Sequence, residues 1–70
     1  MTYDEWRENL YGLWQHSAND EAVLAWVGVV SEVLGREVRR GNTYGPLQHH
    51  WSKLSAEDID RLTVTFKLLF

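Results

Sequence analysis

The chain has 70 residues, with ten acidic against seven basic side chains and a formal net charge of -3 at pH 7. One domain over residues 1–70 fits this length, and a domain so small needs a dense core or a partner to offset the entropy of ordering its chain. The absence of cysteine excludes a disulfide framework and thiolate metal sites, and the acidic balance disfavours unspecific binding to nucleic acid or to an anionic membrane surface.

The first predicted element is a helix over residues 3–15. Thr2 and Glu5 have the spacing of a capping box at its start. Five apolar residues then fall at helical spacing on one stripe: Tyr3, Trp6, Leu10, Leu13 and Trp14. The same opening segment has no cationic region followed by an apolar one, unlike a secretory signal. We therefore expect a cytoplasmic protein.

The stretch from residue 20 to residue 40 is the longest apolar run and predicts a central helix of about that length. Its apolar side chains, mostly valines around Trp26, cover well over half of the helix circumference, so we expect it to lie between the first and last helices. Either Ser17 or Asn19 can cap its start. Arg39 and Arg40, followed by a glycine, predict its end. The segment is too short and too charged to span a membrane.

Two shorter helices are predicted after a turn. Pro46 suits the first position of a helix over residues 46–53. Ser55, with an aspartate three residues later, forms a capping box for a last helix over residues 56–69. Residues 63–70 also alternate as in a strand, and this alternative stays open, although no other segment offers a pairing partner.

These elements together predict an all-α fold, a compact four-helix domain built around the central apolar helix. The predicted core contains thirteen side chains: Trp6, Leu10, Leu13, Trp14, Trp26, Val30, Val33, Leu34, Leu47, Trp51, Ile59, Leu62 and Phe66.

The chain contains no recognisable catalytic motif. It has no Gly-x-Ser-x-Gly elbow, no phosphate-binding glycine loop and no His-Glu-x-x-His pair. His49 and His50 are adjacent, so on a helix they diverge by about 100° and are poorly placed to hold one metal ion. The carboxylates cluster at predicted helix starts, where the helix dipole accounts for them. We predict a protein that is not an enzyme and needs no cofactor or metal.

Small and apolar residues left over from the core favour protein–protein interaction instead. Gly28, Ser31 and Gly35 form a small-residue seam on the otherwise polar side of the central helix, which is either an approach surface or an imperfect surface helix. Val64 and Leu68 lie opposite the core stripe of the last helix. We predict a surface that binds another protein or a second copy of the chain, formed by these residues together with three aromatic ones: Tyr11, Tyr44 and Phe70. The alternative is that the domain uses these rings in its core.

The segment GPLQHHWSKLSAEDI, from Gly45 to Ile59, contains a glycine, an aliphatic residue, a tryptophan, Lys-Leu, a hydroxyl residue and an acidic pair. In this order it resembles a segment of CsbD-like bacterial stress-response proteins. The resemblance extends to Leu62, covers about a quarter of the chain, and implies a small helical bacterial protein without catalytic residues. The valine-rich central stretch departs from that family, whose members are rich in lysine and glycine.

The leading functional hypothesis is a binding module, an inhibitor or adaptor of the kind that bacteria, phages and mobile elements encode. One alternative is a CsbD-like stress-associated structural protein. A second is a small nucleic-acid regulator that uses Arg36, Arg39 and Arg40. Nucleic acid is the less favoured partner, because complementation of the helix dipole also explains these arginines.

Overall fold

A computed structural model describes the backbone of residues 1–14 and 19–70 and the side chains of residues 1–10 and 19–70. This part of the chain contains four α-helices. The helices are α1 (Tyr3–Trp14), α2 (Asp20–Leu34), α3 (Tyr44–His50) and α4 (Ala56–Leu69), and a 3-10 helix, Trp51–Lys53, directly follows α3. The prediction of a compact all-α domain is confirmed. Residues 63–69 continue α4, so the strand alternative is wrong, and the described residues form no strand.

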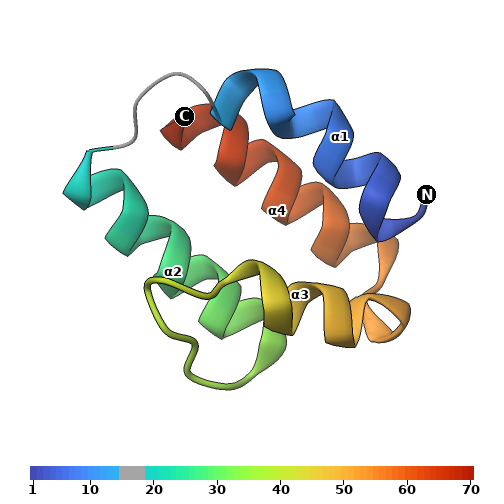
Figure 1. Cartoon of the computed structure of the whole chain (residues 1–70). Helices are drawn as coiled ribbons and strands as arrows, with labels where there is room; N and C mark the ends of the chain where they lie inside the picture. Colours follow the sequence, from blue (N-terminus) through green and yellow to red (C-terminus); the bar gives the residue numbers. More distant parts are fainter. Residues whose placement is uncertain (15–18) are drawn as a thin grey trace.

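The α4 helix lies between α1 and α2 and runs antiparallel to α2 (Figure 1). It packs most extensively against α2, while α3 packs across α2 near its carboxyl end. We expected α2 to take the middle position, and this is wrong. One reason is that α1 is tied to α4, where the Trp6 Nε1–H donates to Thr63 Oγ1 at 2.8 Å. Part of the second side of α2 is covered by the loop that follows it, through Val38.

The α2 helix ends at Leu34, six residues before the end that its apolar pattern predicts. Gly35 adopts left-handed backbone angles, φ 66° and ψ 25°, and its N–H donates to the Glu32 carbonyl. Glycine takes this conformation without the steric cost of a Cβ atom, so it stops the helix here. Residues 36–43 then fold back as a loop, in which Val38 is buried and the three arginines of the nucleic-acid hypothesis are exposed.

Side-chain caps set the starts of α2 and α4 as the sequence indicates. Asn19 accepts from the Ala22 N–H at 2.8 Å, and the alternative cap Ser17 lies outside the described residues. At α4, Ser55 Oγ accepts from the Asp58 N–H at 3.1 Å and Asp58 accepts from the Ser55 N–H at 3.2 Å. The predicted capping box is therefore confirmed in both directions.

We expect Ser55→Ala to lower the free energy of unfolding by about 1 kcal/mol, because the first turn of α4 loses a side-chain acceptor. Urea unfolding followed by circular dichroism measures the change. Ser52→Ala is the matched control, since Ser52 is also exposed and its side chain makes no hydrogen bond within the described residues. Equal stabilities of the two variants would contradict the assignment of Ser55 as a stabilising cap.

The core forms where α4 meets α1 and α2, and α3 closes it against α2. Seven of the predicted core residues are buried: Trp6, Leu10, Trp26, Val30, Leu47, Leu62 and Phe66. Four more pack against them half-buried: Val33, Leu34, Trp51 and Ile59. The side chains of Leu13 and Trp14 are not among those that the structure describes. Tyr3, Ala22 and Val38 are buried in addition.

Trp26 lies at the centre of this core. Its ring centroid is 5.3 Å from that of Phe66 and 6.4 Å from those of Tyr44 and Phe70. Its Nε1–H donates to Thr43 Oγ1 at 3.2 Å, so the one polar atom of this buried ring is satisfied. The Trp26 side chain thereby connects α2 to α4 and to the loop before α3.

Candidate functional site

The structure divides the predicted partner-binding residues among three places. Gly28, Val64 and Leu68 are exposed on the solvent side of α2 and α4. Tyr44 and Phe70 line a pocket at the opposite side of α2. The remaining two described residues, Ser31 and Gly35, lie at the end of α2. The Tyr11 side chain lies outside the described ones.

Ser31 and Gly35 have structural roles at the end of α2. Ser31 Oγ donates to the Val27 carbonyl at 2.7 Å and accepts from the Val38 N–H at 3.3 Å. It thus holds the loop against the helix, while Gly35 reverses the chain. Of the predicted seam, Gly28 and Gly35 are exposed, whereas Ser31 is half-buried and its hydroxyl is used in these two hydrogen bonds.

Gly28 and Gly35 provide a matched pair of substitutions. A Cβ added at Gly28 meets nothing within 4 Å, and residue 28 lies in the interior of α2. We expect Gly28→Ala to raise the free energy of unfolding by about 0.5–1 kcal/mol, because alanine loses less backbone entropy in a helix. Gly35→Ala should lower it by about 1 kcal/mol, because alanine is strained at φ 66°. Urea unfolding of both variants checks the signs, and equal shifts would contradict this account.

A strip of small and apolar residues runs between α2 and α4 on their exposed side. It consists of Ala25, Gly28, Val64 and Leu68, and we call it the outer face. Arg61 of α4 and Glu32 of α2 form an ion pair at 3.0 Å. Glu32 lies on the same flank of α2 as Gly28, and Arg61 on the same flank of α4 as Val64. Because the two helices are antiparallel, these two flanks lie next to each other. Val64 is 57% exposed and Leu68 81% exposed, so the core leaves both uncovered.

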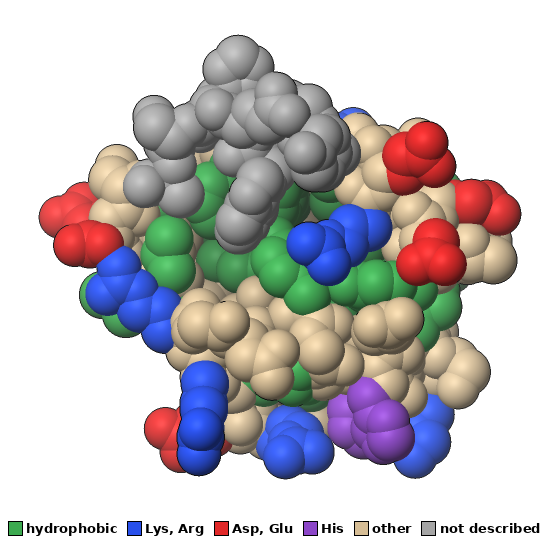
Figure 2. Space-filling view, in the orientation of Figure 1, with side chains coloured by type: hydrophobic (Ala, Val, Ile, Leu, Met, Phe, Trp, Pro, Cys, Tyr) green, Lys and Arg blue, Asp and Glu red, His purple; other side chains and the backbone are tan. Residues whose placement is uncertain are grey.

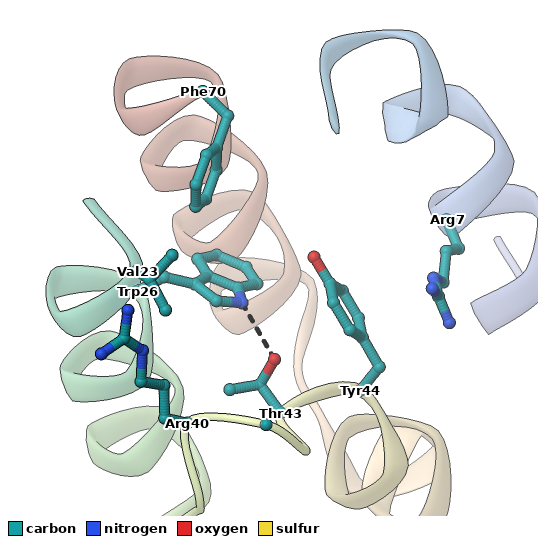
Figure 3. Close-up of a pocket in the computed structure, with 8 residues that line it drawn as sticks. Arg7, Val23, Trp26, Arg40, Thr43, Tyr44 and Phe70 are labelled. Atoms are coloured by element: carbon teal, nitrogen blue, oxygen red, sulfur yellow. Dashed lines mark hydrogen bonds between the residues drawn. The ribbon is translucent and has the colours of Figure 1, made fainter. Parts of the chain in front are cut away.

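The second site is a pocket of about 290 Å³. It is bounded by α1, α2, the loop before α3 and the end of the chain (Figure 3). Its lining combines apolar, hydroxyl and cationic side chains with one glycine: Arg7, Val23, Trp26, Arg40, Gly41, Thr43, Tyr44 and Phe70. Arg7 and Arg40 lie at opposite ends of the close-up, with Trp26 and Tyr44 between them. The opening therefore has an aromatic interior and a cationic rim.

Figure 2 shows hydrophobic side chains exposed across the middle of this side of the molecule, with one basic side chain over them and others to the left and below. Arg7 lies over the Tyr44 ring, 4.2 Å from its centroid, and donates to the Tyr3 hydroxyl at 3.2 Å. Arg40 forms an ion pair with Asp20. Both members of this pair are largely exposed, at 52% and 83% of their side-chain areas, so solvent screens it and it holds Arg40 only weakly.

Two hydroxyl groups also line the pocket. Thr43 is 4% exposed, and its oxygen accepts from Trp26, so its own O–H remains available for a further acceptor. Burial raises the pKa of Tyr44 above its ordinary value of 10.0, against the opposing charge of Arg7. The Tyr44 hydroxyl therefore stays protonated at neutral pH.

The sequence patterns did not single out four of these lining residues: Arg7, Val23, Thr43 and, as a ligand-binding group, Arg40. The four come from α1, α2 and the loop before α3, so no periodicity within one element connects them. A usable signal was the spacing of Tyr3 and Arg7, which places their side chains together on one side of a helix.

The adjacent histidines lie at the end of α3, away from both sites. Their ring centroids are 4.8 Å apart, edge to face, and the His50 Nε2 is buried without a described partner. Burial, followed by the charges of His49, Lys53 and Arg36, lowers the pKa of His50, so this ring is neutral at pH 7. No three His, Cys, Asp or Glu side chains converge on a possible metal position in the described part of the chain.

No described helix combines the length and the apolar character needed to cross a membrane. No protein-family model matches the chain, and neither a curated protein nor a solved structure is similar to it. Functional assignment therefore depends on the outer face and the pocket themselves.

Proposed function

We propose that the chain is a small protein-interaction module of the cytoplasm, an inhibitor or adaptor that binds through its outer face. The supporting observation is the exposure of Val64 and Leu68, one helical turn apart, in a domain whose core closes without them. Single exposed apolar residues are ordinary on protein surfaces. Here the neighbouring flank of α2 carries Ala25 and Gly28, which are also exposed, so both helices present small or apolar residues on this side.

The outer face suits an amphipathic helix of a partner protein. The small side chains of Ala25 and Gly28 leave room along α2, where a Cβ at residue 28 would meet no atom within 4 Å. Val64 and Leu68 border that space from α4. A partner helix laid along the strip can insert apolar side chains at the spacing i, i+3 and i+4, and the Arg61–Glu32 pair supplies a polar rim.

Site-specific photocrosslinking in cells that express the chain tests this proposal. Benzoylphenylalanine replaces Leu68 in one variant, Val64 in a second and Gln48 in a control, since Gln48 is also exposed but lies on α3. We expect an adduct of defined mass from positions 68 and 64 and none from position 48. An adduct of twice the 8.2 kDa chain mass identifies a second copy as the partner. Absence of any adduct at 64 and 68, or equal labelling at 48, contradicts the proposal.

Gly28→Leu gives an independent test of the same surface. Residue 28 is exposed and a Cβ there meets no atom within 4 Å, so a leucine can extend into solvent and the variant should fold. A partner that lies along α2 would meet the new side chain, and crosslinking from position 68 should then disappear. Unchanged crosslinking in the Gly28→Leu background would show that the partner does not approach α2, which contradicts docking along the strip.

A further inference from the structure

We propose that the pocket beside Tyr44 binds a small aromatic carboxylate, with the ring held by apolar side chains and the carboxylate held at the cationic rim. This site is independent of the proposed outer face. None of the four outer-face residues, two on α2 and two on α4, lines the pocket.

The size and apolar lining of the pocket limit the body of the ligand. A volume of about 290 Å³ lies just below the range of pockets for drug-sized molecules, so it suits a compound with one ring system. Val23, Tyr44 and Phe70 are half-buried and present apolar surface to it, and Trp26 forms its floor. Aromatic neighbours favour a ring, because edge-to-face and offset contacts add to the burial of apolar area.

The charges of the lining select an anion. Two arginines line the pocket and no acidic residue does, although the chain as a whole carries a net charge of -3. Within the described residues, Arg7 pairs with no carboxylate, and the one partner of Arg40 is the highly exposed Asp20. A planar guanidinium matches a carboxylate with two parallel hydrogen bonds.

The buried Thr43 hydroxyl adds a directed donor at the floor of the pocket. It is 4% exposed and accepts from the Trp26 indole, which leaves its proton for an acceptor in the pocket. A carboxylate supplies such an acceptor, whereas a cation or a purely apolar ligand does not. The guanidinium groups and the hydroxyl together therefore favour a carboxylate over a neutral ring.

Titration of the ¹⁵N-labelled full chain with phenylacetate, followed by NMR, tests this site. Four indole N–H signals are expected, one for each tryptophan, and the Trp26→Phe variant assigns the one from Trp26. We expect saturable shifts of the Trp26 indole signal and of the Gly41 and Tyr44 backbone amides. Phenylacetamide has nearly the same shape without the charge, and it should bind at least about tenfold more weakly.

The arginine variants make the test specific. Arg40→Gln should raise the Kd for phenylacetate about tenfold, because it removes the charged donor on the same side of the pocket as Thr43. Arg36→Gln is the matched control, since Arg36 is exposed in the same loop as Arg40 but does not line the pocket. The Arg40–Asp20 pair is too exposed to support the fold, so circular dichroism of Arg40→Gln should match that of the parent chain.

Three results would overturn the proposal: no saturable shift with phenylacetate, equal affinity for acid and amide, or equal effects of Arg36→Gln and Arg40→Gln. A short peptide ending in phenylalanine with a free carboxylate separates the two sources of this chemistry. Tighter binding of the peptide than of phenylacetate, lost on amidation, assigns the site to the carboxyl end of a protein. Tighter binding of phenylacetate assigns it to a small metabolite.

Discussion

Replacement of Trp26 by alanine should lower the free energy of unfolding by about 3–5 kcal/mol. The Trp26 side chain is 2% exposed and contacts the ring of Tyr44, at the start of α3, and those of Phe66 and Phe70, at the end of α4. Its removal leaves a large cavity at the junction of α2 with α4 and the loop before α3. A 70-residue domain has about 4–10 kcal/mol of total stability, so much of the variant should be unfolded at 25 °C.

Urea unfolding followed by circular dichroism at 222 nm measures this loss. Trp26→Phe distinguishes the contribution of ring packing from that of the hydrogen bond, because it keeps most of the apolar volume but removes the donor to Thr43. We expect it to cost about 1–3 kcal/mol. Trp51→Ala is the second control and should cost less than Trp26→Ala, since Trp51 is only half-buried. A loss below 1 kcal/mol for Trp26→Ala would mean that the core does not depend on this ring.

Local signals were sufficient to predict where the helices begin. Asn19 and Ser55 act within their own first turns, and a hydrogen bond between positions three residues apart depends little on the rest of the fold. The third helix begins at Tyr44, two residues before the proline at position 46. Helix starts were therefore predicted to within two residues.

The end of α2 was predicted wrongly because two glycines compete for it. Gly41 follows a pair of arginines, and Gly35 interrupts a run in which Val38 continues the apolar pattern. Val38 is indeed buried, but it reaches the core from a loop rather than from a helix. The helical spacing of apolar residues thus continues in the sequence beyond the end of α2. It does so because the loop folds back and buries Val38, as a longer helix would also have done.

The order of packing and the composition of the pocket both depend on tertiary contacts. The apolar residues around most of α2 correctly indicated that other elements cover this helix. Part of the cover comes from the loop of residues 36–43 and not from a helix. The pocket joins Arg7 to Arg40 and Thr43 across more than thirty positions of sequence. No pattern within one helix can reveal such a site, although Tyr44 and Phe70 were predicted to be accessible to a partner.

Leu62→Ala and Leu68→Ala should differ in their effects on stability by several kcal/mol, although both replace leucine by alanine in α4. Leu62 is completely buried, so its truncation should lower the free energy of unfolding by about 2–5 kcal/mol. Leu68 is 81% exposed, and Leu68→Ala should change it by less than about 0.5 kcal/mol. Leu62 lies in the middle of α4 and Leu68 in its last turn, and leucine and alanine differ little in helix propensity, so propensity contributes little to the difference between the two variants.

Urea unfolding of the two variants at several protein concentrations gives both the difference and its cause. If the chain is a monomer, the Leu68→Ala midpoint should be independent of concentration and equal to that of the parent chain. A concentration-dependent midpoint in the parent that Leu68→Ala abolishes would assign the outer face to a second copy of the chain. Equal losses of stability for both leucines at low concentration would place Leu68 in the core of α4, and the outer face would then lack the exposed side chain on which the proposed interaction depends.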